Sequence, residues 1–292
     1  MLNLITKLIA ALPLPVIHRL GAWLGWLLHV CVPSAKHLQQ ENLKQSGLYL
    51  NKAELKRAIH TNISEIGKSI LETLAIWQWP QDKVLAYVKS CDNWHLVKDA
   101  LAAGKGLIFL TPHLGCFEIT SIYYASKHPI TVLFRPPKQS WLAPLIDAGR
   151  IKGEVKLAPA NVQGVRSLMQ ALKNNEAIGM LPDQIPAAGE GEWAPFFGKA
   201  AYTMSLASKL AEKTGASVIM AFGERLADGK GFVIHLTKLE NHAIATPALL
   251  NAAIEAQITQ CPCQYHWSYN RYKVSRKSKR KLGQNVPTDY AD

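Results

Sequence analysis

The stretch GLIFLTPHLGCFEIT, residues 106–120, begins with an apolar run and then carries His113 and Glu118 five positions apart. In one continuous helix, five steps of about 100° set two side chains roughly 140° apart, and in one strand an odd spacing puts them on opposite faces. The two side chains can meet only if the chain bends between them. Gly115 suits such a bend because glycine adopts backbone conformations that other residues avoid. The stretch therefore predicts a strand that ends near His113 and a helix that begins near Glu118.

Similar β-rich runs recur along the chain, with helical segments between most of them. Helical periodicity covers about 36–100, 162–175 and 203–215, where apolar residues recur at steps of three and four. This alternation predicts an α/β fold in which helices flank a largely parallel sheet. The further predicted strands are TVLFR (131–135), EVKLAP (154–159), AIGMLPD (177–183), SVIMAFGER (217–225) and FVIHLTKL (232–239).

Polar side chains stand at the ends of three of these predicted strands. They are His113, Arg135 and Asp183. In open α/β sheets, sites gather at the carboxyl ends of the strands. Each residue alone could be an ordinary strand-end residue, but three of them together predict one site.

The amino end is apolar and predicts a helical segment over residues 1–35. Its longest run free of Lys, Arg and Pro extends only from Leu20 to Val32, whereas a membrane-spanning helix needs about 20 residues. We expect a pair of short helices in the membrane interface, with Trp23 and Trp26 near the lipid headgroups. A helix pair buried in the protein core is the alternative.

The net charge of +12 is strongly local, because RYKVSRKSKRK (271–281) contributes seven Lys or Arg and leaves +5 for the rest of the chain. Such a block attracts nucleic acid, an anionic membrane surface or an acidic protein, or is only a solvated tail. The expected organisation is the apolar segment at 1–35, an α/β domain at 36–275 and a basic, flexible tail at 276–292.

Cysteine usage and the absence of several motifs exclude some classes of protein. Five cysteines at irregular spacing do not form a disulfide framework and fit a reducing compartment. Cys261, Cys263 and His266 could supply three metal ligands, but no second cluster completes a site, so we expect no metal. The chain contains no G-x-S-x-G, no P-loop, no H-E-x-x-H and no complete G-x-G-x-x-G after a strand, and we expect no cofactor.

A histidine held by a carboxylate is suited to general-base catalysis, because the acid fixes the tautomer and stabilises the imidazolium. The sequence offers no obvious nucleophile beside the pair. Cys116 is close to His113 in sequence, but a cysteine before a phenylalanine more often packs in the core than attacks a substrate. The remaining reading is that His113 deprotonates a substrate hydroxyl, which then attacks an activated carbonyl directly.

An H-x-x-x-x-[DE] pair in an α/β chain with an apolar amino end resembles the glycerolipid acyltransferase superfamily. Over about residues 1–275 the chain is most similar to the bacterial lipid A biosynthesis lauroyl/myristoyl acyltransferases. The resemblance also rests on FRPPKQSWLAPLIDAGR (134–150), GVRSLMQALKNNEAIGMLPDQ (164–184), WAPFFGKAAYTMSLASKLAEKTGA (193–216) and QYHWSYNRYK (264–273).

That resemblance implies a transfer of an acyl chain from an acyl carrier protein thioester to a hydroxyl of a lipid A precursor, without an acyl-enzyme. It implies His113 as the base, Glu118 as its partner, and Arg135, Arg150 and Asp183 as substrate-binding residues. It also implies the cytoplasmic face of the bacterial inner membrane. The acceptor is diphosphorylated, which favours arginine as a charge-assisted donor.

Three rival functions remain open on the sequence. The nearest is an acyltransferase of the same superfamily that acts on a lysophospholipid, another glycolipid or an aminolipid. A basic nucleic-acid-binding protein would use the tail, although no nucleic acid is expected as a partner. A cysteine-dependent hydrolase would use Cys116.

Overall fold

The computed structural model describes residues 2–137 and 143–273, so the expected tail at 276–292 lies outside the described residues. Within this part, seven strands form one sheet in the order β1-β9-β8-β2-β5-β3-β4. The sheet strands are β1 (Val88–Asp92), β2 (Leu107–Leu110), β3 (Ile130–Phe134), β4 (Val155–Pro159), β5 (Ala177–Met180), β8 (Ser217–Arg225) and β9 (Phe232–Leu239). A separate antiparallel hairpin consists of β6 (Gly191–Phe196) and β7 (Lys199–Met204).

The sheet is largely parallel, as predicted. β2 lies at its centre and pairs in parallel with both β5 and β8, while β3 pairs in parallel with β5 and β4. The exception is β9, which follows β8 through a turn and pairs antiparallel to it, with β1 parallel to β9 at the edge. The carboxyl ends of β2, β3 and β5 therefore lie at one edge of the sheet.

Both faces of the sheet are buried, and alternate residues of each central strand face opposite cores. In β2, Ile108 and Leu110 belong to one hydrophobic cluster, and Leu107 and Phe109 belong to the other. This alternation is the two-residue repeat of a strand. It explains why the central strands read as unbroken apolar runs, as parallel strands covered on both faces do.

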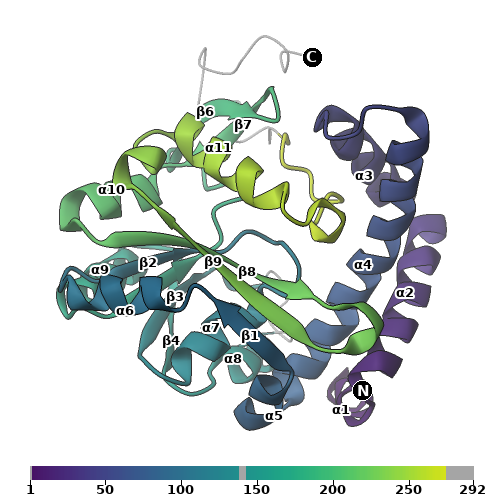
Figure 1. The fold of residues 1–292 in the computed structure, drawn as a ribbon, viewed down its shortest axis with the longest axis horizontal. Coiled ribbons are helices and arrows are strands. Elements are labelled where there is room, and N and C mark those ends of the chain that lie inside the picture. The colour runs from purple at the N-terminus through teal and green to yellow at the C-terminus, as the bar shows by residue number, and fades with distance from the viewer. Residues whose placement is uncertain (1, 138–142, 274–292) are drawn as a thin grey trace.

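Helices supply the other half of each core. The first cluster takes side chains from α9 (Val162–Lys173), α10 (Leu206–Thr214) and α11 (Pro247–Ile258). The second takes side chains from α1 (Leu2–Ala11), α2 (Leu14–Cys31), α4 (Lys52–Gln78), α5 (Gln81–Ala86), α6 (His95–Ala102) and α7 (Glu118–Ala125). In Figure 1, α2, α3 (Pro33–Gln45) and α4 stand together beside the sheet, and α11 lies against the β6–β7 hairpin.

The amino-terminal helices pack with one face and expose the other. α2 lies so close to α4 that a Cβ atom on Gly25 would be only 2.1 Å from the carbonyl oxygen of Ile63. On the outer face Leu4, Trp23 and Val30 are exposed, Trp23 by 82%. One face thus joins the core, as in the alternative arrangement, and the other presents apolar side chains to the surroundings. None of the helices in the described ranges combines the length and apolar character that crossing a bilayer demands.

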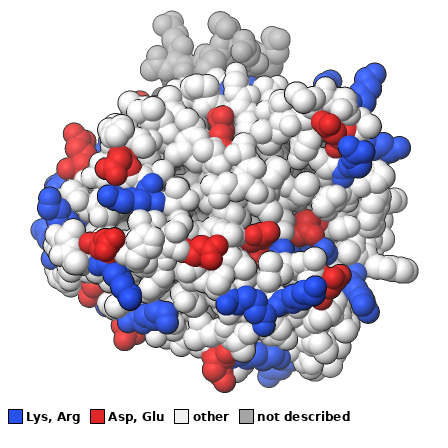
Figure 2. Space-filling view, viewed as in Figure 1, with Lys and Arg blue, Asp and Glu red and all other residues white. Residues whose placement is uncertain are grey.

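The charged side chains form no single basic patch on the face drawn in Figure 2. Lysine and arginine lie at its sides and across its lower half and are interspersed with aspartate and glutamate, while the region above the centre is largely uncharged. A nucleic-acid-binding surface would carry a continuous basic stripe. The described residues of this face therefore do not provide one.

Candidate active site

The segment between β2 and α7, residues 111–117, makes the predicted bend and is called the catalytic loop below. Gly115 in this loop has φ of +59°, and a Cβ there would lie 2.1 Å from the carbonyl oxygen of Gly223. Glycine is therefore required at the bend for both conformation and space. The helix begins at Glu118, as the sequence predicted.

Backbone hydrogen bonds tie the catalytic loop to two other segments. The amide of Cys116 donates to Gly223 of β8 at 2.7 Å, and the amide of Gly115 donates to the carbonyl of Gln264 at 3.1 Å. The amide of His266 donates in turn to the carbonyl of His113 at 3.1 Å. The position of the histidine thus depends on the end of β8 and on residues 264–266, far from it in sequence.

The carboxylate that contacts His113 is Asp183. Its Oδ1 lies 2.9 Å from Nδ1 of the imidazole, and its Oδ2 accepts the backbone N–H of His113 at 2.9 Å. The β2–β5 register pairs Leu110 with Met180, and His113 and Asp183 both lie three residues beyond that pair. Two parallel strand ends thus bring together two residues that are 70 positions apart.

Asp183 is held in its charged form. Burial opposes ionisation of this carboxyl, but the ion pair and hydrogen bonds with His113 outweigh burial, so the pKa of Asp183 is lowered. An ionised carboxylate accepts a hydrogen from Nδ1, which leaves the lone pair of the neutral ring on Nε2. Nε2 lies 3.1 Å from the amide nitrogen of Gln184, whose exposed side chain can yield to a substrate hydroxyl.

Glu118 has a different partner from the one expected. Its Oε1 accepts from Nη2 of Arg150 at 2.6 Å and from Nε at 3.0 Å, and its Oε2 lies 3.2 Å from Nε. Arg150 ends α8 (Ala143–Arg150), and its guanidinium also lies 6.0 Å from the ring of Trp77. Among the described residues, the side-chain hydrogen bonds of Glu118 go to Arg150 and not to His113. The expected pairing of His113 with Glu118 is thus corrected: the helix that Glu118 opens directs its carboxylate toward α8.

A groove of about 600 Å³ opens beside His113. Two other predicted site residues, Arg135 and Arg150, also line it, so all five predicted residues are either in this groove or bonded to a residue in it. Its walls are mixed, with cations and apolar side chains. The apolar lining residues are Leu133, Phe134, Val162, Val165, Leu181, Ile185, Pro186, Met204 and Leu206. Such a groove can accommodate a ligand that is both apolar and anionic.

Gln184 and the catalytic-loop contacts at residues 264–266 are site features that the sequence reasoning missed. The Pro-Asp-Gln run of residues 182–184 was visible after a predicted strand, so it carried a signal for Gln184. The 264–266 contacts depend on tertiary packing alone.

Cys116 does not have the environment of a nucleophile. Its side chain is 2% exposed, and burial raises the pKa of its thiol well above the ordinary value. Reactive cysteines are partly exposed and have a lowered pKa, because the thiolate is the attacking species. Among the described residues, no group of His, Cys, Asp or Glu side chains is arranged to hold a metal ion.

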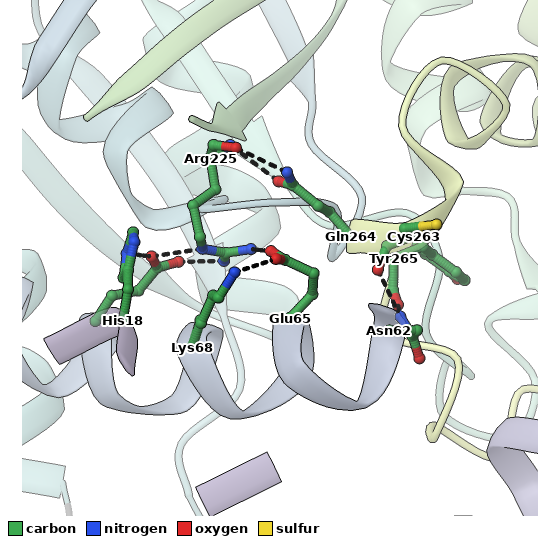
Figure 3. A network of polar contacts seen from close by, with 9 residues as sticks. His18, Asn62, Glu65, Lys68, Arg225, Cys263, Gln264 and Tyr265 are labelled. Carbon is green, nitrogen blue, oxygen red and sulfur yellow. Dashed lines mark hydrogen bonds and ion pairs between the residues drawn. The ribbon is translucent and has the colours of Figure 1, made fainter. Parts of the chain in front are cut away.

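A buried network of charged side chains lies next to the segments that hold the catalytic loop. Arg225, at the end of β8, donates from Nε to Glu72 at 2.7 Å and from Nη1 to Glu65 at 2.6 Å, and its Nη2 also bonds Glu72. His18 of α2 contacts the same Glu72 at 2.9 Å. Figure 3 shows Arg225 extending from its strand toward α4, between His18 and Glu65. The network joins α2, α4 and β8.

The same network reaches the segment that holds the loop. Gln264 exchanges two hydrogen bonds of 2.9 Å with the backbone of Arg225, and its own carbonyl accepts the amide of Gly115. Asn62 of α4 donates to the carbonyls of Cys263 and Tyr265 at 2.8 Å, as Figure 3 shows. α4 thus bonds both segments that hold the catalytic loop: the end of β8 through Arg225, and residues 263–265 through Asn62.

We expect Glu72→Gln to lower the free energy of unfolding by about 3 kcal/mol, because the buried guanidinium of Arg225 loses part of its compensating charge. Burial alone would raise the pKa of Glu72, but the interactions with Arg225 outweigh it and lower that pKa to about 2. Because the folded-state pKa is depressed, this contribution is present above about pH 4.5 and is lost as the pH falls toward 2. Urea unfolding at several pH values measures both effects.

The control for this prediction is Glu212→Gln, at an exposed carboxylate of α10. That change should alter the free energy of unfolding by no more than about 0.5 kcal/mol. Equal stability of the Glu72 and Glu212 variants at neutral pH would contradict the role assigned to the network.

Comparisons with known proteins show the family of the chain. A model of the family described as bacterial lipid A biosynthesis acyltransferase matches residues 1–274. The lipid A biosynthesis lauroyltransferase of Escherichia coli (strain K12) is 24% identical over 273 residues, which cover 91% of this chain and 88% of that protein. The lipid A biosynthesis palmitoleoyltransferase of the same strain is 25% identical over 270 residues, 90% of this chain and 87% of that protein.

A lipid A biosynthesis acyltransferase of Haemophilus influenzae (strain ATCC 51907 / DSM 11121 / KW20 / Rd) is 23% identical over 280 residues, 92% of this chain and 88% of that protein. The family match covers all the described residues, including the catalytic loop and the groove. This protein therefore belongs to the family of bacterial lipid A biosynthesis acyltransferases, and it is an O-acyltransferase.

Proposed function

We propose that the protein transfers a fatty acyl chain from an acyl carrier protein thioester to a hydroxyl of a lipid A precursor, with His113 as the general base. One observation carries the proposal: Nδ1 of His113 is bonded to a buried carboxylate, while the imidazole lines a large groove. A general base needs this arrangement, in which one ring nitrogen is fixed and the other is open to the substrate.

The reaction we propose proceeds by direct attack. His113 Nε2 takes the proton of the acceptor hydroxyl, and that oxygen forms a bond to the thioester carbonyl carbon. The carbon–sulfur bond then breaks, and the departing thiolate receives the proton from the imidazolium. Asp183 holds Nδ1–H throughout and stabilises the charged ring. Because a thiolate is a good leaving group and Cys116 is buried, the proposal has no acyl-enzyme.

Glu118 keeps a role in this proposal through Arg150. The carboxylate bonds Nε and Nη2 of the guanidinium, which fixes its plane. The guanidinium also lines the groove. A fixed cation beside the base can stabilise negative charge that develops on the thioester oxygen. Arg135, which is exposed in the same groove, is proposed to bind an anionic group of the substrate.

The amino-terminal segment, residues 1–35, is proposed to bind the cytoplasmic face of the bacterial inner membrane. Exposed apolar side chains of α1 and α2 support this, with Leu8, Trp23 and Leu27 each more than half exposed. Lys7 and Arg19 lie on the same two helices and suit the anionic headgroups. An acceptor with several acyl chains has to be met at such a surface.

An acyl-transfer assay with competing acceptors tests the function. We expect the purified full chain to acylate a lipid A precursor presented in vesicles, using an acyl carrier protein thioester, in preference to lysophospholipid, another glycolipid or an aminolipid. Intact-protein mass spectrometry of quenched reactions should detect no acyl adduct on the chain. A preference for lysophospholipid would overturn the proposed acceptor. A covalent acyl adduct on the chain that forms and breaks down at least as fast as turnover would overturn direct attack.

A further inference from the structure

The groove beside the base carries cations that no step of the proposed reaction uses. Arg166 of α9 and Lys209 of α10 both line it, in addition to Arg135 and Arg150. Neither Arg166 nor Lys209 has a side-chain hydrogen bond or an ion pair with any residue that the structure describes. Arg150, in contrast, is matched by Glu118. The groove therefore contains positive charge that no carboxylate among the described residues neutralises through an ion pair.

The two cations lie near the amino ends of two helices that contact each other. Val162, Val165 and Arg166 line the groove, and this spacing of three and four puts them on one face of α9. Ser205, Leu206 and Lys209 do the same at the start of α10, and the two helices contact each other. α9 thus presents two apolar side chains in its first turn and Arg166 just after them, and α10 presents Leu206 and then Lys209. That pattern fits an amphiphilic ligand with an anionic group.

The charge balance of the groove favours an anion with more than one negative charge. Glu190 is the carboxylate among the described lining residues, and it is engaged with the amide of Ala187 at 3.2 Å. Against that single negative charge, the groove carries three positive charges besides Arg150, on Arg135, Arg166 and Lys209. An arginine fork together with a lysine is suited to a phosphate group, which accepts several charge-assisted hydrogen bonds at once. The amino termini of α9 and α10 at the same wall add a favourable potential.

We propose that Arg166 and Lys209 form a binding site for a phosphate group of a substrate, on the groove wall formed by α9 and α10. The inference rests on the proposed function for the identity of that substrate, but phosphate binding itself does not. Two phosphates could enter the site: one carried by the acceptor, or the phosphodiester of the arm that bears the donor's thioester. The site anchors the substrate while its reactive group lies beside His113.

Binding is tested first without any turnover. The full chain is titrated with glucosamine 1-phosphate and with glucosamine at low salt, and chemical shifts or heats are followed. We expect saturable binding of the phosphorylated sugar only, weakened about tenfold by Arg166→Gln and by Lys209→Gln, since one charge-assisted hydrogen bond contributes about 1.4 kcal/mol or more. Equal binding of glucosamine 1-phosphate and glucosamine would overturn the proposed phosphate site, whether or not the enzyme is active.

Each variant has a matched control on the same helix. Lys173 lies two turns beyond Arg166 on α9 and Lys213 lies one turn beyond Lys209 on α10, and both are exposed outside the groove. Lys173→Gln and Lys213→Gln remove the same charge and should leave binding unchanged. If these controls weaken binding as much as the groove variants do, the effect is only the net charge of the protein and the proposal fails.

Steady-state kinetics then identify the phosphate. A rise of about tenfold in KM for the lipid A precursor, absent with a dephosphorylated precursor and with kcat within about twofold, assigns the site to the acceptor. A rise in KM for the acyl carrier protein thioester, absent with a thioester on a pantetheine lacking the phosphate, assigns it to the donor. Unchanged KM for both substrates overturns the proposal while leaving acyl transfer established.

Discussion

Replacing His113 by alanine should lower kcat by about 10²–10⁴-fold, the range over which general-base catalysis contributes. The acceptor hydroxyl would lose the group that takes its proton, while the groove that binds the acceptor would remain. We therefore expect KM for the acceptor to change much less than kcat. Initial rates of radiolabelled acyl transfer at saturating donor measure both constants.

The alanine variant should keep its fold, because the hydrogen bonds that place residue 113 in the catalytic loop come largely from the backbone. The amide bonds Asp183 and the carbonyl accepts from His266, and neither bond needs the imidazole. Thermal unfolding checks this point. His95→Ala, at an exposed histidine of α6, is the matched control and should retain full turnover. Near-normal turnover of His113→Ala would remove His113 from the mechanism.

The strands were predictable where burial imposes an apolar run or an alternation of apolar and polar residues. The predicted runs 217–225 and 232–239 coincide with β8 and β9. β1 was missed inside a segment read as helical, because VKSCD (88–92) is an edge strand with only partly buried residues. β6 and β7 were missed as well. β6 contains Pro195, which disfavours a strand, and Ala194 and Phe196 are its buried residues.

The membership of the site was predictable, but the pairing within it was not. Local sequence shows that His113 and Asp183 each follow an apolar strand, and the rule for strand ends then brings them to one edge. Local sequence does not show that β2 and β5 are neighbouring strands. The structure shows this, because Leu110 pairs with Met180. Without that order, the carboxylate nearest in sequence was the natural partner. Glu118 is joined to the candidate site through its bonds to Arg150, which lines the groove.

Asp183→Asn should lower kcat by about 10²–10⁴-fold at nearly unchanged stability. An asparagine amide can donate to Nδ1 of His113, which would move the ring proton to Nε2 and leave the base without its lone pair. The effect should approach that of His113→Ala, because both changes remove the same proton acceptor. The variant is compared with wild type by initial rates and by thermal unfolding.

Double variants decide which carboxylate, Asp183 or Glu118, acts together with His113. Residues that act as one unit give effects far from additive, so His113→Ala combined with Asp183→Asn should be no slower than His113→Ala alone. Glu118→Gln acts through Arg150, and its effect should add to that of His113→Ala. If instead the Glu118 change is silent in the His113→Ala background while the Asp183 change is additive, then Glu118 is the functional partner of the base. In that case, the contact between Asp183 and His113 serves only to hold the catalytic loop.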